Sequence, residues 1–183
     1  DKMVLIDDGC EVNGYAADIT RTFPANGSFS DVEKKCYEIV LKAQIAAIEE
    51  VKPGSCLAKV NDVATHSLVE SLIELGFLSG SVEENMATRA YRDYYPHGTG
   101  HWLGLDVHDV GPDKDTPFVP GMAITVEPGF YVQDYNEDVA PEYKGIGIRI
   151  EDNIVVTEDG YENLTAHCVK TVEDVEAMVK SGL

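Results

Sequence analysis

The chain has 183 residues, of which 44% are hydrophobic and 26% are charged, and this composition is typical of one folded domain. The formal net charge of −19 argues against a nucleic-acid or anionic-membrane partner, because both partners select a basic surface. No apolar stretch approaches the roughly 20 residues that a membrane-spanning helix requires. The four cysteines include no C-x-x-C pair. This favours a reducing compartment, and we expect a cytoplasmic protein.

The first expected element is a β-hairpin. Strands over residues 3–7 and 15–23 flank Asn13 and Gly14, and this dipeptide is the strongest short-range signal for a two-residue turn. The apolar strand begins almost at residue 1, which is not a methionine. We therefore expect a piece of a longer protein, in which residues 1–183 form one partial domain and from which an organelle leader could have been lost.

Helix-capping patterns predict the helices. Ser30 and Glu33 form a capping box, and apolar residues recur on one stripe of the next segment, which ends at Gly76. The helices expected from such signals cover about 31–51, about 57–75, a stretch from 81 that stops before Pro96, and 171–182. Strands and loops are expected over 96–157. This order indicates an α+β fold with a curved, mainly antiparallel sheet.

Two aspartates of the hairpin are expected to lie close together. A two-residue turn places Asp7 opposite Thr20 and Gly9 opposite Asp18, so Asp7 and Asp18 are diagonal neighbours with Cα atoms roughly 7–8 Å apart. Their carboxylates repel each other unless a cation or a proton lies between them, and Gly9 leaves room for a cation. The alternative is that both side chains point into water.

A second pair of charged residues lies in GIGIRIEDNIVV (145–156). Isoleucines alternate along this segment, which is typical of the interior of a sheet, and Arg149 and Glu151 share the opposite face. Charged groups there require partners, which a metal ion, a substrate or each other could supply. The alternative is a wet outer face with an ordinary ion pair. Glu127, in ITVEPGFY, also follows an apolar run.

Three of the five histidines lie in HGTGHWLGLDVHDVG (97–111). Gly98 and Gly100 disfavour a helix, so the segment does not form a helical H-E-x-x-H zinc motif. In a straight strand His101 and His108 would face opposite ways, and both reach one site only if the glycines bend the backbone. The spacing favours a functional role over packing, whereas His66 and His167 are isolated and are expected to be structural.

The residue types narrow the chemistry further. Four candidate carboxylates and at least one imidazole, without a thiolate, suit Mn²⁺, Co²⁺, Fe²⁺ or Zn²⁺. Five protein ligands are too many for one catalytic ion. They suit two ions roughly 3.5–4 Å apart with bridging carboxylates.

These segments together resemble a known family. IDDGCEVNGYAADITRTF, HGTGHWLGLDVHDVG, VEPGFY and GIRIEDNIVVT are similar to the Xaa-Pro aminopeptidases, also called aminopeptidase P. These belong to the pita-bread metallopeptidases, together with prolidase and methionine aminopeptidase. The resemblance covers essentially the whole chain and implies a pita-bread catalytic domain whose first part is missing.

The resemblance implies a set of ligands for two divalent ions, with Mn²⁺ as the first choice and Co²⁺, Zn²⁺ or Fe²⁺ as alternatives. Asp7 would hold one ion, and His101 and Glu127 would hold the other. Asp18 and Glu151 would bridge the two ions. A water or hydroxide between the ions would attack the carbonyl group that precedes proline.

The resemblance also implies roles for side chains around the ions. Glu127 would transfer the proton as well as bind metal. His97, His108 and Arg149 would line the substrate side, with Tyr131 nearby, so the middle histidine of the three would be the ligand.

The implied reaction is hydrolysis of the bond between an N-terminal residue and a following proline in a peptide. The expected partner is therefore a peptide with proline at its second position, and the full-length protein is a possible homo-oligomer. We expect the full protein to be active and this chain alone to be weakly active or inactive. Two alternatives remain: a prolidase, which cleaves Xaa-Pro dipeptides, and a non-catalytic interaction module with the same fold.

Overall fold

The structure is a computed structural model that describes residues 2–182. Its N-terminal hairpin forms in the predicted register, with Val12 paired with Tyr15 and Asp7 paired with Thr20. Asn13 and Gly14 both have positive φ, 55° and 86°, as a type I′ turn requires. The hairpin consists of β1 (Met3–Asp8), β2 (Glu11–Val12), β3 (Tyr15–Ala16) and β4 (Ile19–Pro24).

The expected continuous strand over 15–23 is wrong in one respect, because the ladder breaks between β3 and β4. At the break the N–H of Ala17 donates to the carbonyl of Cys10 at 2.8 Å. A Cβ atom on Gly9 would overlap the carbonyl oxygen of Ala17. The carbonyl of Ala17 therefore occupies the room that the absent side chain of Gly9 leaves, and Asp18 lies outside regular strand pairing.

The helices begin at the predicted caps. Ser30 and Ser81 each form a complete capping box with the glutamate three residues later, and the hydroxyl of Thr171 accepts a hydrogen bond from the N–H of Asp174. These contacts satisfy backbone donors that a helix start leaves unpaired. The helices are α1 (Asp31–Glu49), α2 (Leu57–Glu74), α3 (Val82–Thr88), the 3-10 turn η1 (Ala90–Asp93) and α4 (Val172–Ser181).

The second group of strands lies between η1 and α4. It consists of β5 (Ala123–Val126), β6 (Gly129–Tyr131), β7 (Gly147–Arg149), β8 (Asp152–Val156) and β9 (Tyr161–Asn163), with a 3-10 turn η2 (Pro141–Tyr143) between β6 and β7. β6 pairs with β7, and β8 lies between β5 and β9. Every ladder within residues 2–182 is antiparallel, which confirms the predicted sheet type.

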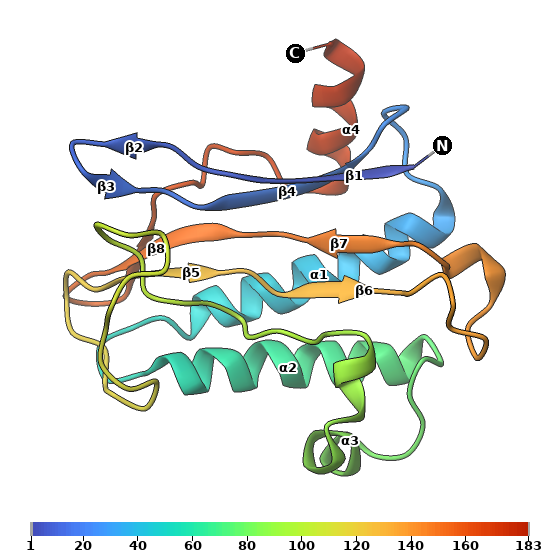
Figure 1. Ribbon diagram of the computed structural model, residues 1–183, viewed down its shortest axis with the longest axis horizontal. Helices are drawn as coiled ribbons and strands as arrows, with labels where there is room; N and C mark the ends of the chain where they lie inside the picture. Colours follow the sequence, from blue (N-terminus) through green and yellow to red (C-terminus); the bar gives the residue numbers. More distant parts are fainter. Residues whose placement is uncertain (1, 183) are drawn as a thin grey trace.

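The strand groups lie side by side, and the helices are arranged around them. The backbone N–H of Glu151 donates to the carbonyl of Thr20 at 3.1 Å and so joins the hairpin to the segment between β7 and β8. Figure 1 shows α1 and α2 along one side of the strands, whereas α4 packs against β4. The fold is therefore α+β, as predicted. None of the described helices has both the length and the apolar character needed to cross a membrane.

The isoleucine-rich segment lies in the core. Ile146, Ile148 and Ile150 belong to one buried cluster, and Ile154 and Val156 belong to a second cluster. Burial of this face leaves the side chains between these isoleucines on the opposite face of the strand.

Candidate metal centre

Five chemically suitable side chains come together, and three of them lie at places where regular strand pairing stops. Asp18 lies between β3 and β4, Glu127 between β5 and β6, and Glu151 between β7 and β8. Asp7 is near the end of β1, and His101 lies next to an isolated bridge between Trp102 and Ile124. A break in a ladder leaves a side chain free to turn out of the pleat, so each break delivers one functional group to the same region.

The ligand atoms of these residues form two overlapping groups. One oxygen each of Asp7, Asp18 and Glu151 lies within 4.8 Å of the others. The ligand atoms of His101, Glu127 and Glu151 meet the same limit. Because Glu151 belongs to both groups, the arrangement suits two ions that share a carboxylate.

The carboxylates are crowded and partly shielded from water. Burial, followed by the charge of Glu127, raises the pKa of Glu151 to about 8. Burial also raises the pKa of Asp18, with a further contribution from Asp7, and it raises the pKa of Glu127. At neutral pH Glu151 therefore retains a proton unless a cation compensates its charge.

One buried atom of the cluster has no hydrogen-bond partner among the described residues. This atom is Oε1 of Glu151, a residue that is 1% exposed. Buried carboxylate oxygens are normally hydrogen-bonded or bound to a cation. The residues therefore fit a divalent metal centre.

The ring of His101 is oriented in a way that suits a ligand. Its Nδ1 lies 2.9 Å from the carbonyl oxygen of Trp102, and since a carbonyl can only accept, Nδ1 carries the proton of the neutral ring. Its Nε2 lies 3.3 Å from Asp18 Oδ2 and 3.4 Å from Glu127 Oε1. In the neutral ring a lone pair then faces two carboxylates, an arrangement that a proton or a metal ion stabilises.

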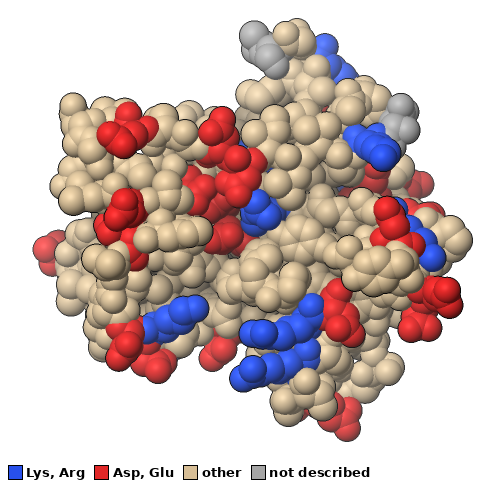
Figure 2. Space-filling view, in the orientation of Figure 1, with Lys and Arg blue, Asp and Glu red and all other residues tan. Residues whose placement is uncertain are grey.

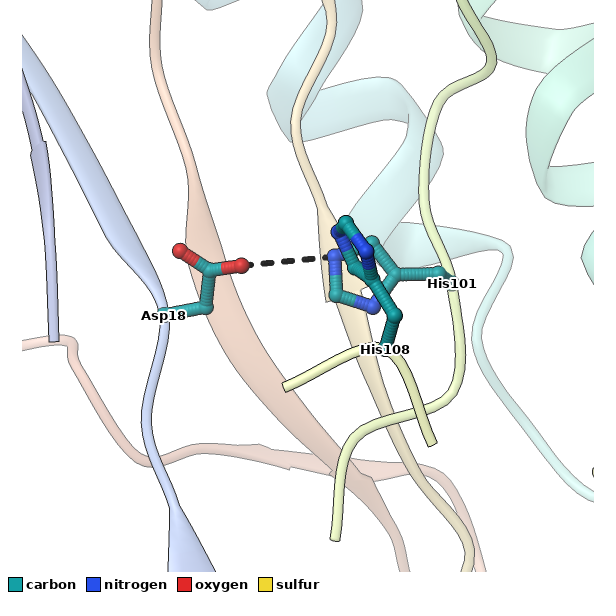
Figure 3. Close-up of side chains that lie close together, drawn as sticks. All are labelled: Asp18, His101 and His108. Carbon is teal, nitrogen blue, oxygen red and sulfur yellow. Dashed lines mark ion pairs between the residues drawn. The ribbon is translucent and has the colours of Figure 1, made fainter. Parts of the chain in front are cut away.

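His108 reaches the same region, although it is seven positions from His101. The two imidazole rings are 4.4 Å apart at an interplanar angle of 82°, and Figure 3 shows both rings on one side of Asp18. His108, His101 and Asp18 form a third group with donor atoms within 4.8 Å of one another. The chain bends tightly here, because a Cβ atom on Gly104 would overlap Asp109 Oδ2. The predicted bend is confirmed.

Arg149, Tyr131 and His97 form a hydrogen-bonded chain that ends at Asp7. Arg149 donates to Asp7 Oδ2 at 2.6 Å and to the Tyr131 hydroxyl at 3.0 Å. The Tyr131 hydroxyl lies 2.7 Å from His97 Nε2, and His97 Nδ1 lies 2.8 Å from the carbonyl of Gly98. Arginine only donates and a carbonyl only accepts, so the neutral His97 accepts from Tyr131. Burial, which lowers the pKa of His97, favours this neutral ring.

Three further side chains, which the sequence pattern did not single out as site residues, contact the five proposed metal ligands. Asn153 binds the backbone of Asp18 twice: its Oδ1 accepts from the N–H at 3.2 Å, and its Nδ2 donates to the carbonyl. Thr20 and Thr125 bind the carboxylates of Glu151 and Glu127. Each of the three lies two residues from a proposed ligand. The period of two along a strand was therefore a usable signal.

The isolated histidine of α2 and the single tryptophan have ordinary environments. His66 is exposed and lies 3.6 Å from Glu70, one helical turn away. Trp102 packs edge-on against the buried Phe118, with ring centroids 6.0 Å apart. Both observations agree with structural roles.

A cleft of about 560 Å³ opens beside the cluster, lined by Asp7, Asp18 and His108 together with residues 8–11 and 16–17 of the two hairpin arms and residues 105–107. Figure 2 shows acidic side chains gathered over β1 and β4, with a basic group next to them. Two of the proposed ligands, Asp7 and Asp18, therefore line an open cleft.

Comparison with known proteins identifies the class to which this fold and site belong. Residues 1–158 match the model of metallopeptidase family M24, and the chain belongs to that family. The chain is 48% identical over 180 residues to the Xaa-Pro aminopeptidase of Escherichia coli K12, and 41% identical over 177 residues to human Xaa-Pro aminopeptidase 3. These matches cover 97% and 96% of this chain, but 41% and 34% of the relatives. The chain thus spans about two fifths or less of the relatives' length.

Solved structures give the same result. The aminopeptidase PepP of Pseudomonas aeruginosa superposes with a TM-score of 0.95 at 46% identity, covering 98% of this chain and 41% of that one. A zinc-substituted aminopeptidase P of E. coli in complex with product also has a TM-score of 0.95, at 47% identity, and covers 99% of this chain and 42% of that one. The resemblance to the pita-bread metallopeptidases is confirmed.

Proposed function

We propose that this chain carries the dinuclear metal centre of an Xaa-Pro aminopeptidase, which hydrolyses the bond between an N-terminal residue and a following proline. The observation that carries the proposal is the convergence of three other carboxylates and one imidazole on Glu151, whose buried Oε1 has no hydrogen-bond partner within residues 2–182. The names of the relatives, Xaa-Pro aminopeptidase and aminopeptidase P, support the substrate class.

In this proposal Asp7 would hold one ion, His101 and Glu127 would hold the other, and Asp18 and Glu151 would hold both. Mn²⁺ is the first choice, and Co²⁺, Zn²⁺ and Fe²⁺ suit the same donors. When bound, divalent ions lower the pKa of water and polarise a carbonyl group. A neighbour is described as zinc-substituted, which supports a site that accepts more than one metal.

The side chains perform the remaining steps. Hydrolysis before proline releases a secondary amine, which must take up a proton, and in this proposal Glu127 transfers a proton from the attacking water to that nitrogen. Burial raises the pKa of Glu127, which brings this carboxyl group closer to the pH range in which it can both accept and release a proton. His97, His108, Arg149 and Tyr131 bind and orient the peptide.

Metal content and peptide hydrolysis test the proposal together. The purified chain should retain close to two Mn²⁺ ions, whereas a non-catalytic interaction module should retain none. We assign the activity to the whole protein and expect it to release arginine from Arg-Pro-Pro. A prolidase would instead cleave only dipeptides such as Ala-Pro. We expect this chain alone to be weaker, because it spans 41% of the length of its E. coli relative.

A further test is Glu127→Gln in the whole protein, which keeps the shape of the side chain but removes both its charge as a proposed metal ligand and its proton transfer. The variant should lose the release of arginine. A whole protein that binds Mn²⁺ fully but leaves Arg-Pro-Pro and Xaa-Pro dipeptides intact would contradict the peptidase assignment. The proposed setting is cytoplasmic, and the proposed partner is a peptide with proline second.

A further inference from the structure

Two buried threonines occupy equivalent positions beside the metal centre. Thr20 in β4 and Thr125 in β5 are both 0% exposed. The hydroxyl of Thr20 lies 2.6 Å from Glu151 Oε2 and 3.1 Å from Arg149 Nε. The hydroxyl of Thr125 lies 3.2 Å from Glu127 Oε1 and 3.1 Å from the backbone nitrogen of His101. Each hydroxyl thus lies between one N–H group and one carboxylate.

The chemistry of the neighbours fixes the direction of these hydrogen bonds. The Nε–H of Arg149 and the backbone N–H of His101 can only donate, so each occupies a lone pair of a threonine oxygen. A hydroxyl group has a single proton, and in both threonines this proton is left to point at the carboxylate. The carboxylate oxygen that receives it must act as an acceptor.

A fixed direction has two consequences for the carboxylates. Thr20 engages Oε2 of Glu151 and leaves Oε1, the buried oxygen without a partner, as the free ligand atom. Thr125 connects two groups, because Glu127 Oε1 also lies 3.4 Å from His101 Nε2. Each threonine therefore restricts the rotation of one proposed ligand.

We propose that Thr20 and Thr125 are positioning residues of the metal centre, which orient Glu151 and Glu127 through hydroxyl groups that can donate only toward those carboxylates. The inference rests on the proposed metal-binding function. Residues that support metal ligands by hydrogen bonds typically contribute about 10- to 100-fold to metal affinity, and we expect a loss of that size for each threonine.

The test measures the binding of Mn²⁺ alone to the purified chain. The concentration of free Mn²⁺ is monitored through its electron paramagnetic resonance signal. Thr20→Val and Thr125→Val keep the branched shape and remove the hydroxyl. Thr22→Val is a matched control, because Thr22 is equally buried in β4 and, within residues 2–182, its hydroxyl bonds only to the backbone of Arg149, at 2.9 and 3.1 Å. Thr20→Ser and Thr125→Ser restore the donor and should restore the affinity.

The outcomes separate this inference from the function on which it rests. Weaker Mn²⁺ binding by about 10-fold or more in either Thr20→Val or Thr125→Val, with normal binding in Thr22→Val and the serine variants, supports it. Unchanged binding in both valine variants overturns it while leaving the metal centre intact. Absence of Mn²⁺ binding by the unaltered chain overturns the metal centre and this inference together. If one valine variant does not fold, the other carries the test, since the two threonines lie in different ladders.

Discussion

Replacement of Asp152 by asparagine should destabilise the protein strongly, although Asp152 binds no proposed ligand directly. Its carboxylate is fully buried and accepts hydrogen bonds from five side chains. Two of these are cations, Arg21 at 2.7 Å and Lys170 at 2.6 Å. Burial opposes ionisation of Asp152, but Arg21, Lys170 and the other donors outweigh it and hold its pKa well below the ordinary range.

The size of the effect follows from what the substitution leaves behind. The introduced amide would be neutral and would turn an N–H₂ group toward one of the cations, so their charge would lose its compensation in a largely buried place. Removing one partner of a buried ion pair costs about 3–5 kcal/mol, which is a fifth or more of a typical stability of about 5–15 kcal/mol. We therefore expect Asp152→Asn to reduce the free energy of unfolding by about 3 kcal/mol or more.

Urea denaturation followed by circular dichroism, at pH 7 with a chelator present, measures this change. Asp62→Asn, at an exposed position of α2, is the control and should change the stability by less than about 0.5 kcal/mol. Because the folded pKa is lowered, the stabilisation by Asp152 is present above the ordinary Asp pKa and is lost as the pH falls through the folded pKa. The variant should lack this acid dependence. A loss below about 1 kcal/mol at pH 7 would refute the reasoning.

The pKa of Glu151 is raised to about 8, so below pH 8 an incoming Mn²⁺ ion must displace a proton from this carboxyl group. The affinity of the chain for Mn²⁺, measured by calorimetry, should therefore fall as the pH is lowered from 8. An affinity that does not change with pH would contradict this prediction. For the same reason the metal-free chain should lose thermal stability as the pH rises from the ordinary Glu pKa through 8, and Mn²⁺ should reverse that trend. His101→Ala should abolish binding of one Mn²⁺ ion, whereas His108→Ala should keep both ions and lose affinity for the peptide. Metal analysis that shows an equal loss of Mn²⁺ in the two variants would place His108 among the ligands. Gly9→Ala should destabilise the hairpin, because the new Cβ would meet the Ala17 carbonyl, and urea denaturation that shows no loss would argue against the close backbone contact.

Local signals predicted the elements well because their causes are local. Asn13 and Gly14 tolerate the positive φ that a type I′ turn requires, so the turn and its register could be inferred without any distant contact. The two capping boxes, Ser30 with Glu33 and the pair that starts at Ser81, likewise depend on groups three residues apart. The helix starts were therefore correct to within one residue.

Local sequence signals did not predict the strand interruption that arises where the backbones of two hairpin arms come into close contact. Nothing in the residue pattern predicts an interruption of the strand at Asp18, because its residues alternate normally. The interruption comes from the close approach of Gly9 and Ala17 in the folded hairpin. Similarly, the sequence left the partners of Arg149 open among metal, substrate and Glu151. The folded chain provides Asp7 and Tyr131 instead, both from segments that precede Arg149 in the sequence.

The sequence by itself determined most of the helix and turn boundaries, the α+β class and the residue types that resemble a metallopeptidase. These follow from turn geometry, capping and side-chain periodicity within short stretches. The resemblance already implied that Asp18, His101 and Glu151 hold the same pair of ions, but only the tertiary structure decided their distances and the contacts of Thr20 and Thr125 with the carboxylates. Asp18 and Glu151 are 133 positions apart, and the distances between such residues depend on how the ladders pack together, which no local pattern encodes.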